Sequence, residues 1–141
     1  MIENNKKQDF EGTEDEARIE EARNYLCGYQ LCIDMLQLRS YERKRARKFG
    51  ESFDCPDILS GSELYWRARM HEIQKLIDKM RNGRDKLMLY YHYVQGESIE
   101  HSANLIGVSR RTGYRIHKRA LRVFSYLYER ERTSDLYPTG S

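Results

Sequence analysis

Residues 96–121, GESIEHSANLIGVSRRTGYRIHKRAL, contain the pattern that decides the fold. Ser98 and Ser109 each stand where the free N–H groups at the start of a helix need a cap. Gly107 lies between them, where the chain must turn and where a residue without a Cβ adopts the left-handed backbone at least cost. The second segment carries arginines on one side and apolar residues on the other. The stretch therefore predicts two helices joined by a tight turn, a helix-turn-helix.

Within the first of these helices, the apolar side chains are expected to face inward. They are Ile99, Ala103, Leu105 and Ile106. Gly96, directly before it, is a good stop for the apolar segment 85–95, which is rich in leucine and tyrosine and is expected to form a buried helix. After the turn, Val108 and Ile116 are expected to reach the core from either side.

The rest of the chain upstream is also predicted to be helical, because apolar residues recur at spacings of three and four. Thr13 and Glu16 have the spacing of a capping box, and so do Ser60 and Glu63. The first stripe consists of Ile19, Ala22, Leu26, Tyr29, Ile33 and Leu36. The second consists of Trp66, Met70, Ile73, Ile77 and Met80. Asn82-Gly83 is expected to end the helix of the second stripe.

These signals divide the chain into five segments and predict an all-α fold. They are a disordered N-terminus (1–12), a long amphipathic helical arm (13–49), a loop (50–61), a helical module (62–132) that contains the helix-turn-helix (96–121), and a disordered tail (133–141). No strand-like alternation and no internal repeat interrupts this pattern.

Charge is distributed unevenly along the chain. The net charge is only +3, but arginine and lysine cluster at 39–48 and again at 110–122, whereas the first twenty-odd residues are acid-rich. Local basic patches are typical of proteins that bind a polyanion. For 39–48 two interpretations stay open: a solvated helix end whose cations suit the helix dipole, or a second arm that contacts phosphates.

Other chemistry has little support in the sequence. The three cysteines, Cys27, Cys32 and Cys55, form an odd set without a signal peptide, which favours free thiols in a reducing bacterial cytoplasm. Cys27 and Cys32 should point to different faces of one helix. The histidines lack partners at ligand spacing, so no metal site is expected. No catalytic triad, phosphate loop or membrane span is found, so we expect neither an enzyme nor a cofactor nor a membrane partner.

The run LMLYYHYVQGESIEHSANLIGVSRRTGYRIHKRAL, residues 87–121, resembles a known family. With its flanks from about Ile73 to Tyr128, it is similar to the region 4 helix-turn-helix of bacterial sigma factors. It resembles still more the small sigma-like late transcription regulators of phages and prophages, the RinA/ArpU-like group. The shared features are an apolar helix ending in Tyr-x-x-Gly, an Ile-x-x-x-Ala helix, a Leu-x-Gly-x-Ser turn and an Arg-Ala-Leu exit. The resemblance implies a sigma region 4-like module preceded by a long helix.

Two positions depart from the family pattern. Ser102 stands where the family usually has Ile or Val, and Gly113 stands where it usually has Val. These two positions normally pack against each other. Small residues at both predict either a closer approach of the two helices or filling of the space by an aromatic ring such as Tyr114 or Tyr90.

If the second helix enters the major groove of DNA, the outward residues of its N-terminal half meet base edges and phosphates. The residues expected to meet base edges are Arg110, Arg111, Tyr114, Arg115 and Lys118. The candidate readers among them are Arg110, Arg111 and Arg115, because arginine forks match guanine O6 and N7. The residues better placed for phosphates are Ser109, Thr112 and Lys118, followed by Arg119 and Arg122 as the helix leaves the groove. The alternative is a cationic helix face that is merely solvated.

The leading hypothesis is a sequence-specific transcription regulator that binds double-stranded DNA, as a phage or prophage late-gene activator working with host RNA polymerase. Because no segment resembles the sigma region that binds the minus-ten element, it is not expected to replace a sigma factor. The stripe allows the long N-terminal helix either to form a homodimer or to dock on the helix-turn-helix module of its own chain. Two alternatives are a small terminase-like subunit that recognises DNA for packaging, which predicts a ring, and a helical adaptor of RNA polymerase that does not bind DNA.

Overall fold

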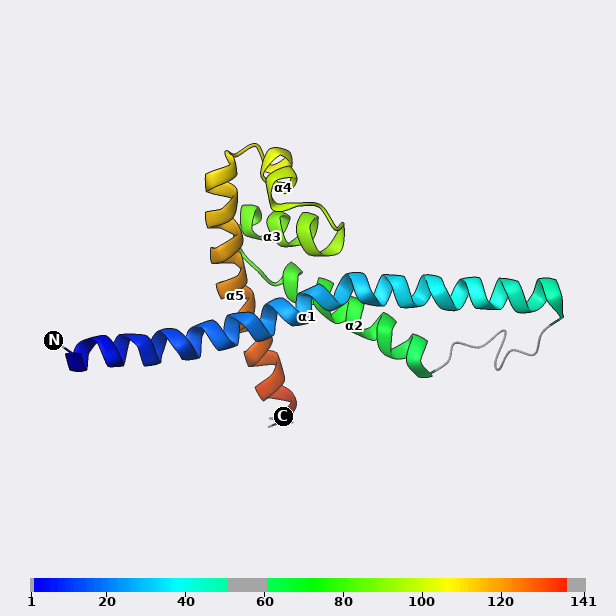
Figure 1. Cartoon of the computed structure of the whole chain (residues 1–141), viewed down its shortest axis with the longest axis horizontal. Helices are drawn as coiled ribbons and strands as arrows, with labels where there is room; N and C mark the ends of the chain where they lie inside the picture. The colour runs from blue at the N-terminus through cyan, green and yellow to red at the C-terminus, as the bar shows by residue number, and fades with distance from the viewer. Residues whose placement is uncertain (1, 51–60, 137–141) are drawn as a thin grey trace.

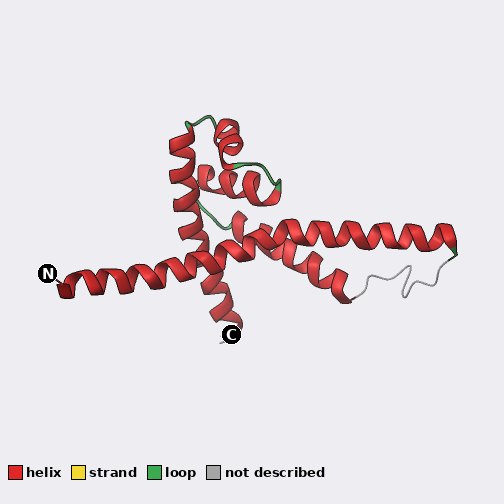
Figure 2. Cartoon of the chain, in the orientation of Figure 1, coloured by secondary structure: helices red, strands yellow, loops and turns green. Residues whose placement is uncertain are grey.

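The computed structural model describes residues 2–50 and 61–136, with side-chain environments for 14–50 and 61–133. All regular structure in these parts is helical, which confirms the all-α prediction (Figure 2). α1 (Ile2–Phe49) is the longest helix, and α2 (Gly61–Asp78) lies along its C-terminal half (Figure 1). α5 (Arg110–Leu136) crosses α1 steeply, so that α3 (Gly83–Leu89) and α4 (Ile99–Ile106) lie with the first half of α5 on one side of α1.

The N-terminal boundary of α1 differs from the prediction. The helix begins at Ile2, so the disorder expected for 1–12 is corrected for residues 2–12, and Thr13 is not an N-cap. The segment contains no proline, and its single interior glycine, Gly12, costs a helix only about 1 kcal/mol. Extending an existing helix needs no new nucleus, so a polar sequence can continue one.

The core forms where α1, α2 and α5 meet. Ala22, Leu26 and Tyr29 of the predicted α1 stripe are buried, as are Ile73 and Ile77 of the α2 stripe, which confirms both patterns. From the opposite side, α5 adds Ala120, Leu121 and Phe124 to the same cluster. The helical arm is therefore part of the core of the module rather than an appendage to it.

Glu63 in the first turn of α2 makes contacts with α1 that its capping-box spacing does not predict. Its side chain is 2% exposed and pairs with Arg43 and, at 3.6 Å, with Arg39 of α1. Ser60, the other half of the predicted box, lies outside the described residues. Two cations of the basic run 39–48 thus face into the molecule and connect α1 to α2.

The predicted helix 85–95 consists of two parts. α3 is capped by Asn82, whose side-chain oxygen accepts from the N–H groups of Arg84 and Asp85. α2 already ends at Asp78, so the prediction that Asn82-Gly83 ends it is wrong. A π-helical turn, η1 (Tyr90–Val94), follows α3. The expectation of burial on most sides is wrong for Leu87 and Tyr90, which are 41% and 40% exposed, whereas Met88, Leu89 and Tyr93 are buried.

Gln30 of α1 explains how the wide π turn ends. Its side-chain amide donates hydrogen bonds to the carbonyl oxygens of Tyr93 and Val94, at 3.1 and 2.7 Å. Carbonyl groups at a helix end need such partners. Gly96 then takes a φ of 76°, which confirms it as the stop predicted from the sequence.

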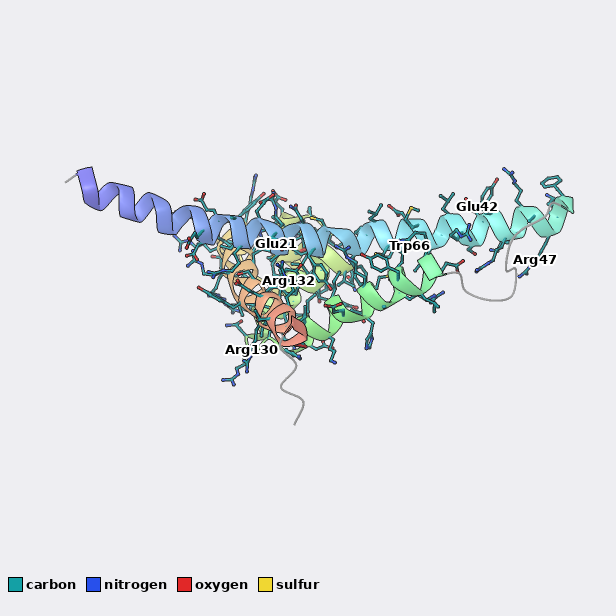
Figure 3. The ribbon with its side chains drawn as sticks, turned by 90° about the horizontal axis from the view of Figure 1, so that it is seen from below. Glu21, Glu42, Arg47, Trp66, Arg130 and Arg132 are labelled. Atoms are coloured by element: carbon teal, nitrogen blue, oxygen red, sulfur yellow. The ribbon has the colours of Figure 1, made fainter. Side chains whose placement is uncertain are left out.

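α5 extends further than expected. It continues to Leu136, so the prediction of a disordered tail is corrected for residues 133–136, and residues 137–141 lie outside the described part. Two ion pairs hold this end: Lys79 with Glu131, at 2.8 Å, and Arg132 with Glu21 of α1. Figure 3 shows Glu21 and Arg132 side by side where α5 passes α1.

Candidate nucleic-acid interface

The turn between α4 and α5 spans three residues, 107–109, and its backbone is as predicted. Gly107 has φ 87° and ψ 32°, the left-handed conformation. The N–H groups of Gly107 and Val108 both donate to the carbonyl oxygen of Ala103, at 2.9 Å, which closes the end of α4. This turn fixes the direction in which α5 leaves.

Both predicted N-caps form. The Ser98 hydroxyl accepts from the N–H of His101 at 3.0 Å, and the Ser109 hydroxyl accepts from the N–H of Thr112 at 3.2 Å. Ser109 also donates to the Thr112 hydroxyl at 3.0 Å. Ser109 and Thr112, predicted as phosphate contacts, thus have a structural role at the start of α5 and remain at the surface beside the turn.

The two small residues that depart from the family pattern lie at a close crossing of α4 and α5. A Cβ added to Gly113 would lie only 2.5 Å from the Cβ of Ala103. Ser102 is fully buried, and its hydroxyl donates to the Ser98 carbonyl oxygen at 2.7 Å. The closer approach is therefore confirmed, whereas filling by Tyr114 or Tyr90 is wrong, because both rings are at least 40% exposed.

Leu105 was expected to face inward from α4, but it is 49% exposed, so that prediction is wrong. Ala103, also expected inward, is 1% exposed. Beyond the turn, Ile116 is buried and Val108 is partly buried. α4 therefore presents a narrower apolar face to the core than its sequence suggests, which its close packing on Gly113 explains.

Four exposed cations form one stripe along the first half of α5. They are Arg111, Arg115, Lys118 and Arg122. Their spacing of four, three and four places them on one helical face, about 16 Å long at 1.5 Å per residue. Within residues 14–50 and 61–133, no carboxylate lies within ion-pair distance of any of the four. Their charge is thus available to an external anion.

Arg110, the third candidate base reader, and Tyr114, which was also expected to meet base edges, share one carboxylate. Arg110 Nη2 lies 3.5 Å from Glu100 Oε1 of α4, and the Tyr114 hydroxyl donates to the same oxygen. These contacts shift two pKa values: the Tyr114 hydrogen bond lowers the pKa of Glu100, and the Glu100 hydrogen bond raises the pKa of Tyr114. Glu100 was not among the residues predicted from the sequence.

Arg119, which was predicted as a phosphate contact, has a partner inside the protein. Its Nε and Nη2 donate to Asp85 Oδ1 at 3.0 and 2.8 Å, a forked arrangement that links α5 to α3. The Asp85 side chain is only 3% exposed, so it needs this cation. Hydrogen bonding to Asp85 raises the pKa of the already strongly basic Arg119.

α5 contacts the π turn through His117, whose ring packs against the rings of Tyr93 and His92. The Tyr93 hydroxyl and His117 Nε2 share a hydrogen bond of 2.7 Å, and His92 packs edge-on against His117 at 5.3 Å. Burial, with a smaller contribution from His92, lowers the pKa of His117 to about 4. Burial also raises the pKa of Tyr93. Both groups are therefore neutral near pH 7.

The described residues contain no cluster of three or more histidine, cysteine or acidic side chains that could hold a metal ion. None of the helices described is both long enough and apolar enough to cross a bilayer. Cys27 is exposed and Cys32 is buried, as expected for opposite faces of α1, while Cys55 lies outside the described residues.

Function must be inferred from the geometry of α4, the turn and α5. No protein-family model, no curated protein and no solved structure matches this chain. At the level of class, this is an all-α protein whose fourth and fifth α-helices are joined by a tight turn that presents a cationic helix face.

Proposed function

We propose that the chain is a sequence-specific DNA-binding protein that inserts the first half of α5 into the major groove. The cation stripe Arg111–Arg115–Lys118–Arg122 carries this proposal, because it is exposed, without carboxylate partners in the described residues, and directly follows the turn. A groove about 12 Å wide admits one α-helix, and its phosphates flank the helix on both sides. A stripe of about 16 Å spans about three turns of the helix, so its first residues would enter the groove and its last would lie where the helix leaves it.

The residues divide by their position along the stripe. Arg111 and Arg115 lie in the first two turns of α5, so their guanidinium groups would contact base edges, preferably guanine O6 and N7. Lys118 and Arg122 lie further along, where the helix leaves the groove, and would contact phosphates. Arg119 supports the interface indirectly, because its pair with Asp85 orients α5 on α3.

The biological role rests on the resemblance to sigma region 4 and to the RinA/ArpU-like regulators. We infer from it a transcription regulator of phage or prophage late genes that acts in the bacterial cytoplasm with host RNA polymerase. The resemblance runs from about Ile73 in α2 to Tyr128 in α5, and this segment includes the cation stripe.

The test uses the full chain. It would first select binding sequences from a pool of random duplexes, and fluorescence anisotropy would then measure affinity for the selected duplex and for a scrambled one. Arg111→Ala or Arg115→Ala should cost about 1–3 kcal/mol on the selected duplex and less on the scrambled one.

Arg130→Ala is the matched control, because Arg130 is an exposed arginine near the other end of the same helix. It should leave both affinities unchanged. Equal losses for the Arg111 and Arg130 variants, or no salt-dependent binding by the wild type, would reject the proposal.

A further inference from the structure

One carboxylate, Glu100, lies at the edge of the proposed DNA-binding face. It belongs to the first turn of α4, yet it pairs with Arg110 in the first turn of α5. Tyr114, one turn further along α5, donates its hydroxyl to the same oxygen, and the Arg110 guanidinium lies 6.0 Å from the centre of the Tyr114 ring. Glu100 therefore holds the candidate base reader Arg110 and the outward residue Tyr114 together from a neighbouring helix.

Stability alone explains this cluster poorly. The side chains of Arg110 and Glu100 are 75% and 43% exposed, and Tyr114 is 42% exposed. Exposed ion pairs contribute little to folding, because water and salt screen them. The crossing of α4 and α5 is fixed instead by Gly113, Ala103 and the turn at Gly107.

The position of Glu100 has a cost for binding to DNA. An acidic group beside a phosphate backbone repels it, and a duplex that draws Arg110 away must replace the contact with Glu100. A guanine edge can do this, because its two acceptors match the guanidinium fork. A phosphate in random sequence offers no such bidentate base contact in the groove.

We propose that Glu100 is a specificity-determining residue, which holds Arg110 and Tyr114 in place and disfavours DNA that offers Arg110 no base contact. This inference rests on the proposed function. Glu100 thereby lowers affinity for random sequence more than for the selected site.

The experiment compares wild type with Glu100→Gln, which keeps the shape of the side chain and removes its charge. Affinities would be measured on the selected duplex and on a scrambled duplex over a range of salt concentrations. Affinity for the scrambled duplex should rise about fivefold at low salt, as expected for loss of one charge about 4 Å from another in water. Affinity for the selected duplex should change by less than about twofold, so discrimination falls about fivefold.

Glu97→Gln is the charge-matched control, because Glu97 lies just before α4 and pairs with His101 rather than with α5. It should change discrimination by less than about twofold. The thermal midpoints of both variants should match the wild type, which separates a role in specificity from a role in folding.

Three outcomes would overturn the inference. Equal changes for the Glu97 and Glu100 variants would show a general charge effect. Loss of affinity on the selected duplex alone would show that Glu100 reads a base directly. Unchanged discrimination would show no role at all. If the wild type binds neither duplex, the proposed function fails first, and this inference fails with it.

Discussion

Gly113→Ala should lower the free energy of unfolding, although alanine is the better helix former. The new Cβ would lie 2.5 Å from the Cβ of Ala103, whereas nonbonded carbons pack at about 3.5–4.0 Å, so α4 and α5 must separate by about 1 Å. Overpacking of this kind costs about 1–3 kcal/mol, and the helix preference of alanine offsets about 1 kcal/mol. The midpoint of that cost, about 2 kcal/mol, leaves an expected net loss of about 1 kcal/mol, or roughly 2–4 °C in Tm for a domain near this size.

Urea and thermal denaturation followed by circular dichroism would measure this loss. Gly83→Ala is the matched control, because Gly83 is the first residue of α3 and a Cβ there meets no atom within 4 Å. It should leave the protein unchanged or stabilise it by about 0.4–1 kcal/mol. The double variant Gly113→Ala with Ala103→Gly removes one of the two clashing carbons and should show a favourable coupling of at least about 0.5 kcal/mol.

A Gly113→Ala protein as stable as the wild type would contradict the predicted clash between α4 and α5. A failure of Ala103→Gly to couple with Gly113→Ala would contradict it too, because the cost would then come from a contact other than the crossing. DNA affinity adds a second readout, since a 1 Å separation of α4 from α5 should displace the cation stripe relative to α4.

Substitutions at Gly107, His117 and Arg119 test the turn, a buried ring and a buried ion pair. Gly107→Val should destabilise by at least about 1–2 kcal/mol in the same denaturation assay, because a branched residue must adopt φ 87°, and an unchanged Tm would contradict the placement of the turn. His117 has a folded pKa of about 4 against an ordinary 6.5, so the unfolded chain binds more protons between these values, and stability should fall as pH drops from 6.5 to 4, by about 3 kcal/mol at most. Urea titrations at several pH values would show this slope, and His117→Gln should flatten it. Arg119→Met should lower stability by about 1–3 kcal/mol by leaving the Asp85 carboxylate buried without its cation, with equal effects on selected and scrambled DNA; selective loss on the selected duplex would show that Arg119 reads bases.

The sequence predicted those features that depend on residues a few positions apart. Gly107, the caps at Ser98 and Ser109, and the α1 and α2 stripes all follow from local backbone needs or from helical periodicity. The exposed positions Arg111 and Arg115 follow from the same periodicity once the turn is placed. Such signals need no knowledge of how the helices pack.

Pairs that join different helices could not be predicted in this way. Asp85 lies in the first turn of α3, where the helix dipole favours an acidic residue. Nothing in the local sequence therefore marks it as the partner of Arg119. Glu63 matches a capping box by spacing, but nothing local indicates its pair with Arg43. The correct interpretation depends on which helix lies opposite, and that is settled only by packing.

The helical arm, residues 13–49, shows how packing between helices changes an interpretation made from the sequence. The sequence places a boundary between residues 13–49 and the helical module, yet Leu26 and Tyr29 of α1 lie in one core with Phe124 of α5, and Gln30 closes the π turn beneath α4. A homodimer through the predicted stripe would compete with this core for the same side chains. A dimer that keeps the fold must instead use the outer face of α1, where Leu31 and Leu38 are exposed. The stripe allowed packing on the same chain or on a second chain, and here it packs on α2 and α5 of its own chain.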